Sequence, residues 1–193
     1  MSEQLPTRSP ELMSREETAL LVIDLQDRLL AAQPEGARVV WNTRRLVDGA
    51  GALGLSVAAT EQVPEKLGPT TAELAERLPD RLSKTCFSSA WSGRLLEDWR
   101  AAGVRHVVVA GIETHVCVAQ TVLDLIAEGF EPKIVVDAVG SRYAIDHETA
   151  LGRLEASGAL LTTTEAALFE WCADAADPAF KAISALAKET APE

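Results

Sequence analysis

Short runs of apolar residues recur along the chain, separated by segments in which apolar residues repeat at helical spacing. Runs of this length without alternation are typical of strands buried on both faces, as in a parallel sheet. Six runs predict strands, at 18–23, 55–59, 82–85, 107–110, 132–137 and 159–162. The third run is weak, and it is predicted to be a strand because the rhythm of the other elements requires one there.

Helices are predicted between the strands from apolar spacing and from stop signals such as Gly54 and Gly129. The predicted helices cover 39–53, 91–102, a segment from about Cys117 to Gly129, 146–157, 165–172 and 178–188. The segment 61–71 is predicted to be a loop over the carboxyl edge of the sheet. Strands that alternate with helices in this way predict an α/β domain with a parallel sheet.

The length of 193 residues fits one α/β domain. We therefore expect a single domain over 18–193, preceded by a polar lead over 1–17. This lead has no apolar signal core and no basic amphipathic face, and no apolar segment reaches the length of a membrane span. The sequence predicts a cytoplasmic protein that does not enter a membrane.

Charge and cysteine usage narrow the class of partner. The chain carries 18 basic and 29 acidic residues, for a net charge of −11, and has no cluster of Lys or Arg. Nucleic acids and anionic membranes are therefore not expected partners. Its three cysteines, Cys86, Cys117 and Cys172, are far apart and odd in number, which indicates a reducing compartment rather than a disulfide framework.

Three predicted strand ends carry side chains with a chemical use. Asp24 follows the first strand, Lys84 lies on the third, and Cys117 follows the turn after the fourth. Carboxyl ends of parallel strands share one edge of a sheet, where ligands bind. A nucleophilic thiol needs a base for its proton and a cation for its anion. Taken singly, Cys117 fits a packing residue, Asp24 a helix cap and Lys84 a surface residue.

Cys117 is predicted to lie in the first turn of a helix, with Thr114 as the N-cap. Helix N-termini and nearby cations lower the pKa of a thiol, so Lys84 should favour the thiolate while Asp24 opposes it. We expect Cys117 to be the most reactive thiol in a way that depends on Lys84. Cys86 and Cys172 are expected in packed surroundings, with a resolving thiol as the less favoured role for Cys86.

Three motifs resemble those of the isochorismatase-like cysteine hydrolases. They are V-I-D-L-Q at 22–26, S-K-T-C-F-S around Lys84 and G-I-E-T-H-V-C-V at 111–118. The segments 60–70 and 141–154 look most like the isochorismatase-domain-containing proteins of that superfamily. The resemblance implies a three-layer Rossmann-like fold, with a six-stranded parallel sheet flanked by helices. It also implies a catalytic triad of Asp24, Lys84 and Cys117.

The resemblance further implies that the backbone N–H groups of Glu113 and Cys117 form an oxyanion hole, with a cis peptide bond between Ile112 and Glu113. The implied reaction is hydrolysis of a small amide or related C–N bond through a Cys117 thioester. Enzymes that hydrolyse isochorismate generally lack this cysteine. The alternative is an oligomeric binding or scaffold protein that retains the triad.

Relatives that hydrolyse nicotinamide carry an Asp-x-His metal motif, where this chain has Glu61 within T-E-Q-V-P. Glu61 and His115 would supply at most two ligands, so no metal and no cofactor are expected. On a helical turn His115 should also point away from Cys117.

Glu61, Phe87 and Trp91 are candidates for the substrate pocket, although aromatic residues at a helix start are more often core or interface residues. Since relatives commonly form dimers or rings, we expect a homo-oligomer that acts on a small molecule. The four tryptophans are candidate interface anchors; they are Trp41, Trp91, Trp99 and Trp171.

Overall fold

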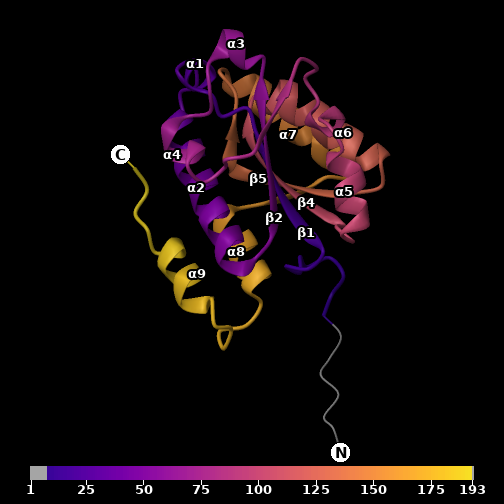
Figure 1. Ribbon diagram of the computed structural model, residues 1–193, viewed down its shortest axis with the longest axis vertical. Coiled ribbons are helices and arrows are strands. Elements are labelled where there is room, and N and C mark those ends of the chain that lie inside the picture. Colours follow the sequence, from indigo (N-terminus) through magenta and orange to yellow (C-terminus); the bar gives the residue numbers. More distant parts are fainter. Residues whose placement is uncertain (1–7, 193) are drawn as a thin grey trace, which may run out of the picture.

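Six parallel strands form one sheet in the order β3-β2-β1-β4-β5-β6 in the computed structural model, which describes residues 8–192 (Figure 1). The strands are β1 (Thr18–Ile23), β2 (Ser56–Gln62), β3 (Arg81–Lys84), β4 (His106–Ile112), β5 (Glu131–Gly140) and β6 (Leu160–Thr162). Each predicted strand is present. The β2 and β5 strands continue past their predicted ends, to Gln62 and Gly140.

Helices cover both faces of the sheet and complete a three-layer Rossmann-like fold (Figure 1). One layer contains α2 (Gly36–Leu53), α8 (Thr164–Cys172) and α9 (Phe180–Ala187), and the other contains α5 (Leu95–Ala101), α6 (Ala119–Ala127) and α7 (Ala144–Ala156). The shorter helical elements are α1 (Asp27–Leu30), α3 (Pro64–Leu67), α4 (Ala72–Ala75), the 3₁₀ turn η1 (Ser89–Trp91) and the π-helical turn η2 (Thr114–Val118).

The central strands β1 and β4 are buried at every position. Alternate residues of β1 face opposite layers: Leu20 and Val22 pack toward α2 and α8, whereas Leu21 and Ile23 pack toward α5 and α6. Burial of each such side chain stabilises the fold by about 1.5–3 kcal/mol. Both faces of the sheet therefore need apolar residues, which explains why these strands show no polar alternation.

Three predicted boundaries are wrong. The helix expected from residue 91 begins only at Leu95, because Gly93 adopts a left-handed φ of 57° between η1 and α5. The fourth strand does not end at Ala110, as predicted, but continues to Ile112, and η2 precedes the regular helix α6. The loop predicted from residue 61 begins after Gln62 and contains α3.

Gly111 allows β1 and β4 to approach each other closely. Its φ is 127°, and a Cβ atom at this position would lie 2.1 Å from the carbonyl oxygen of Ile23. No other residue fits there without moving one of the two strands. The next peptide bond, between Ile112 and Glu113, is cis as the family resemblance implied.

The N-terminal segment contacts the domain before β1 begins. Met13 is buried, and its backbone N–H donates to the Glu170 carboxylate, while Arg15 forms an ion pair with Asp177. The first seven residues of the predicted polar lead lie outside the described residues. Across 8–192, no helix has the length and apolar character needed to cross a membrane.

Candidate active site

The side chains of Asp24, Lys84 and Cys117 meet at the carboxyl edge of the sheet. Lys84 Nζ donates to Asp24 Oδ2 at 2.6 Å, and the two side chains are 1% and 0% exposed. Cys117, in η2, is 6% exposed, and its thiol interacts with both charges. In the sheet, β1 lies between β2 and β4, and β3 lies next to β2. This order brings Asp24 and Cys117 together, although they are 93 positions apart in sequence.

Lys84 is fixed by acceptors on three sides. In addition to the bond to Asp24, its Nζ donates to Gln62 Oε1 at 2.6 Å and to the Phe87 carbonyl oxygen at 2.9 Å. The Cys86 carbonyl oxygen lies further away, at 3.4 Å. An ammonium group has three protons to donate, so these acceptors engage all of them. The surface role considered for Lys84 is therefore wrong.

Burial raises the pKa of the Cys117 thiol to about 12; the negative charge of Asp24 adds to this effect, and Lys84 opposes it. The expectation of a lowered thiol pKa is therefore wrong. Its physical cause is the loss of water around a potential anion, which outweighs one nearby cation. The resting side chain is a neutral thiol, which becomes a nucleophile only when a base takes its proton.

Asp24 adopts a left-handed φ of 53° directly after β1. Its carboxylate accepts a hydrogen bond from Thr60 Oγ1 at 2.8 Å on Oδ1, while Lys84 occupies Oδ2. The following helix α1 has Gln26 as its N-cap residue, without a side-chain cap. The helix-cap role considered for Asp24 is therefore wrong, since its carboxylate faces Lys84 and Thr60.

The η2 turn is held by the segment between β5 and α7. The Glu113 carboxylate accepts from Gln33 Nε2 at 3.1 Å, from Arg142 N at 3.1 Å and from Arg142 Nε at 3.0 Å. Burial acts to raise the pKa of Glu113, but these donors outweigh it, and the net shift is downward. An ionised Glu113 therefore anchors the start of the turn that carries Cys117.

Two further contacts attach η2 to Ser141, just after β5, and to His147 in the first turn of α7. Thr114 Oγ1 pairs with His147 Nδ1 at 2.9 Å, and His115 Nδ1 pairs with Ser141 Oγ at 3.1 Å. The N-cap role predicted for Thr114 is wrong, because its hydroxyl faces His147 and η2 has no side-chain cap. His115 faces Ser141, as expected for a residue that is not the partner of Cys117.

The pocket role predicted for Glu61 conflicts with its position. Glu61 Oε1 accepts from Thr70 N and Thr70 Oγ1, each at 2.7 Å, and from Arg81 Nε at 2.9 Å. Successive strand residues face opposite sides of the sheet. Thr60 and Gln62 therefore face the triad, and Glu61 faces the opposite layer, where it holds the loop that follows β2.

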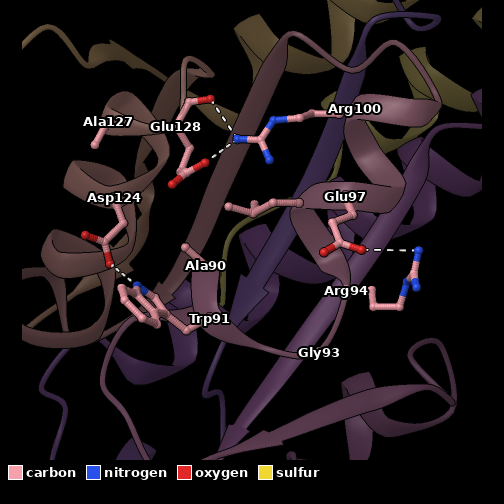
Figure 2. Close-up of a pocket in the computed structure, with 10 residues that line it drawn as sticks. Ala90, Trp91, Gly93, Arg94, Glu97, Arg100, Asp124, Ala127 and Glu128 are labelled. Carbon is pink, nitrogen blue, oxygen red and sulfur yellow. Dashed lines mark hydrogen bonds and ion pairs between the residues drawn. The ribbon is translucent and has the colours of Figure 1, made fainter.

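Trp91 is 75% exposed and lines a cavity of about 490 Å³ between η1, α5 and α6. Its indole N–H donates to Asp124 at 2.8 Å, and Figure 2 shows Arg100 and Glu128 across the cavity. None of the triad residues lines this cavity, so the role predicted for Trp91 in the triad's pocket is wrong. Phe87 is 50% exposed and lies three residues after the end of β3, and its substrate contact stays a prediction.

Other predicted residues have mixed outcomes. Cys86 is exposed and lies beyond the end of β3, so the packed surroundings expected for it are wrong, whereas Cys172 is buried as expected. Trp99 and Trp171 are 3% and 1% exposed, so they belong to the core and cannot anchor an interface. Over residues 8–192, no three His, Cys, Asp or Glu side chains lie close enough to hold a metal ion.

Sequence patterns did not identify the polar residues that surround the triad. Thr60 follows the predicted strand and Gln62 falls in the predicted loop, whereas both lie on one face of β2 because they are two residues apart. Ser89 and Thr121 lie in a turn and a helix whose positions the sequence does not relate to β2. Only the packed structure brings these side chains to Asp24 and Cys117.

The six-stranded parallel sheet flanked by helices is the fold expected from the resemblance to the isochorismatase-like hydrolases. Residues 18–166 match the model of the isochorismatase domain, and the chain belongs to this family.

The chain is 39% identical over 175 residues to isochorismatase domain-containing protein 1 of Danio rerio. The matched residues cover 88% of this chain and 60% of that protein. Among solved structures, the MAR1 ribonuclease of Caenorhabditis elegans superposes with a TM-score of 0.88 and 35% identity, covering 94% of this chain and 95% of its own. The YcaC protein of Escherichia coli, described as an octameric hydrolase of unknown specificity, has a TM-score of 0.81 and 26% identity, with 94% and 93% covered.

Proposed function

We propose that this protein is a metal-independent cysteine hydrolase that cleaves a small, non-peptide amide or a related carbamoyl or ureido C–N bond through a Cys117 thioester. The observation that carries the proposal is the neutral Cys117 thiol beside the buried Asp24–Lys84 pair. The Cys117 thiol does not ionise by itself, so nucleophilic catalysis requires an adjacent base to remove its proton. Membership of a hydrolase family supports the proposal.

In the acylation half-reaction, Asp24 takes the proton of Cys117 as the sulfur attacks the substrate carbonyl carbon. Charge moves from the carboxylate to the carbonyl oxygen, where we expect the backbone N–H groups of Glu113 and Cys117 to bind it. The protonated Asp24 then gives its proton to the leaving nitrogen. The C–N bond breaks, the amine or ammonia departs, and the acyl group remains on sulfur.

In the deacylation half-reaction, Asp24 acts as a base again and removes a proton from water, which attacks the thioester. The C–S bond breaks and the proton returns to Cys117 sulfur, so that the acid leaves and the starting state is restored. Lys84 stays charged throughout and keeps Asp24 in place. Its contribution is electrostatic, because all its protons are engaged by acceptors.

A panel of small amides, carbamates and ureides tests the proposal, with released ammonia or amine as the readout. We expect turnover of at least one compound, and a loss of more than about 10³-fold in Cys117→Ala and Asp24→Asn. The exposed Cys86 provides a matched control, since Cys86→Ala removes a thiol outside the triad and should keep full activity. Turnover that survives Cys117→Ala would refute the thioester.

The same panel separates the hydrolase from the alternative of a scaffold protein that retains the triad. A scaffold would turn over none of the compounds, and its binding to a partner would be unaffected by Cys117→Ala. The buried ion pair argues for the hydrolase, because two desolvated charges cost more than an apolar pair of the same size and contribute little to stability.

We also propose that the protein forms a homo-oligomer. The relative from Escherichia coli is described as an octamer. In this chain Tyr143 and Ile145 are 64% and 70% exposed and lie together at the start of α7. Two large apolar side chains at one place on the surface are suited to contact with a second copy.

A further inference from the structure

A chain of buried hydroxyl groups starts at the Asp24 carboxylate. Thr60 Oγ1 donates to Asp24 Oδ1 at 2.8 Å, and Thr60 Oγ1 lies 3.0 Å from Ser89 Oγ. Thr60 and Ser89 are 1% and 0% exposed. The two residues come from β2 and η1, which are separated by β3 in sequence but adjacent at this edge of the sheet.

The direction of each hydrogen bond follows from the number of protons. A threonine hydroxyl has one proton, and an ionised carboxylate can only accept, so the Thr60 proton must point at Asp24. Ser89 Oγ must then donate its own proton to Thr60 Oγ1 at 3.0 Å. The bonds run in one direction, from Ser89 through Thr60 to Asp24, and each polarises the next.

A second arm leads from Ser89 to the nucleophile. The Ser89 backbone N–H donates to Thr121 Oγ1 at 2.8 Å, and Thr121 Oγ1 donates to the Cys117 carbonyl oxygen at 2.6 Å. Thr121 is fully buried in α6, one turn after Cys117. Ser89 is therefore bonded on one side to the base and on the other to the backbone of the nucleophile.

We propose that Thr60 and Ser89 are positioning residues that hold the Asp24 carboxylate in place beside Cys117, an inference that rests on the function proposed above. A hydrogen bond to the charged form of an acid favours that form. Thr60 supplies such a bond to Oδ1, and Lys84 supplies the other to Oδ2. Two donors therefore hold the buried Asp24 carboxylate in place, where it can accept the Cys117 proton.

The test measures Cys117 alkylation by iodoacetamide against pH, with the labelled cysteines identified by mass spectrometry. Sulfur forms a bond to carbon, iodide leaves and the thiol proton goes to solvent. When Asp24 and Cys117 are both protonated, no base is left to take the thiol proton, so the rate of alkylation decreases at low pH. This decrease is the acid limb of the pH profile. In Thr60→Val the carboxylate loses a donor, and this acid limb should move to higher pH by about one unit.

Three variants make the result specific. Thr60→Ser keeps the hydroxyl, and its acid limb should match that of the native protein. Thr43 is a matched control, because its hydroxyl is fully buried in α2 without a hydrogen-bond partner in the described chain, so Thr43→Val should leave the limb in place. Ser89→Ala should move the limb in the same direction by less, and adding it to Thr60→Val should move it no further.

Asp24→Asn separates a failure of this inference from a failure of the proposed function. If Asp24 is the base, this variant has no acid limb, and Cys117 labelling rises only with ionisation of the thiol itself. An acid limb that persists in Asp24→Asn would refute the base. If Asp24→Asn removes the limb while Thr60→Val leaves it where it was, the positioning role of Thr60 and Ser89 is wrong and the base stands. The exposed Cys86 is present in every sample and serves as the internal reference for alkylation.

Discussion

At the scale of single residues, burial has the largest influence on the chemistry of the site. Cys117 is 6% exposed, and the cost of an anion in that position raises its pKa to about 12 despite a nearby ammonium group. The same burial makes Asp24 and Lys84 depend on each other, since neither charge has access to water. The thiol stays neutral, and proton transfer to Asp24 becomes part of the attack.

The raised pKa of Cys117 predicts a loss of stability at alkaline pH. The unfolded thiol ionises around its ordinary pKa of 9.0, whereas burial raises the pKa of the folded thiol to about 12. Between these values the unfolded state has fewer bound protons, so the free energy of unfolding falls with rising pH by about 1.4 kcal/mol per unit. Urea unfolding at several alkaline pH values should show a shallower decline in Cys117→Ser than in the native protein. Equal slopes would contradict the shift.

Lys84→Met leaves the Asp24 carboxylate buried without its counter-ion. We expect a loss of about 3–5 kcal/mol in the free energy of unfolding, measured with urea. Adding Asp24→Asn should restore part of the loss, and the exposed Lys181→Met should change stability by less than about 0.5 kcal/mol. A small effect at Lys84 would show that water reaches the pair.

At the scale of elements, strand ends and the segment after β5 decide where the reactive groups lie. The close contact of β1 and β4 at Gly111 fixes the end of the strand that precedes η2. Bonds from Arg142 to Glu113 and from His147 to Thr114 attach η2 to the start of α7. The nucleophile is therefore held by a turn with partners on both sides, rather than by a free loop.

Gly111→Ala tests the contact between the two central strands. The added Cβ would lie 2.1 Å from the Ile23 carbonyl oxygen, so we expect a loss of more than about 4 kcal/mol in the free energy of unfolding. Gly51 in α2 is a matched control, because a Cβ there meets nothing within 4 Å, and Gly51→Ala should stabilise the helix by about 0.5–1 kcal/mol. Urea unfolding of both variants gives the comparison, and a mild effect at Gly111 would mean that the strands can separate.

At the scale of the whole molecule, the surface is acidic and carries a few exposed apolar side chains. Tyr143 and Ile145 lie beside the segment that holds η2, so contact with a second copy there would also bear on the site. Trp91 lies in a separate cavity over α5 and α6 (Figure 2). The two features mark different regions of the surface.

The mass in solution tests the homo-oligomer. Light scattering at micromolar concentration should give a multiple of 20.6 kDa, and Ile145→Asp should lower the mass by placing a charge in the contact. A native mass of one chain would contradict the proposal. An unchanged oligomer in Ile145→Asp would place the contact elsewhere on the surface.

The net charge of −11 predicts that this chain does not bind RNA, although a similar protein from Caenorhabditis elegans is named a ribonuclease. Binding to nucleic acid depends on neutralising phosphates with Lys and Arg. Fluorescence anisotropy of a labelled single-stranded RNA should show no binding at low salt, where electrostatic attraction is strongest. Saturable binding under these conditions would contradict the prediction.

The sequence by itself determined the strands, the order of helices and the three residues of the proposed triad. Apolar runs need burial on both faces whatever their neighbours are, and a polar residue directly after such a run must lie at the edge of the sheet. Asp24 directly follows such a run, Lys84 lies on the third run, and Cys117 follows the turn after the fourth. Together with the resemblance of the motifs around them, these positions selected the three residues without coordinates. The pocket role predicted for Glu61 is wrong because β2 continues three residues beyond its apolar pattern. Glu61 therefore lies on the face of β2 that points away from the triad.

Only the tertiary structure decided the state of those residues. The Cys117 pKa depends on how much water packing removes, and no local pattern records that quantity. The partners Thr60, Gln62 and Ser89 come from elements whose register is set by strand pairing and by the packing of η1 on α6. A local sequence pattern predicts which side chains lie at the end of a strand. Hydrogen bonds between elements distant in sequence form only when the chain is folded, so no local pattern predicts them.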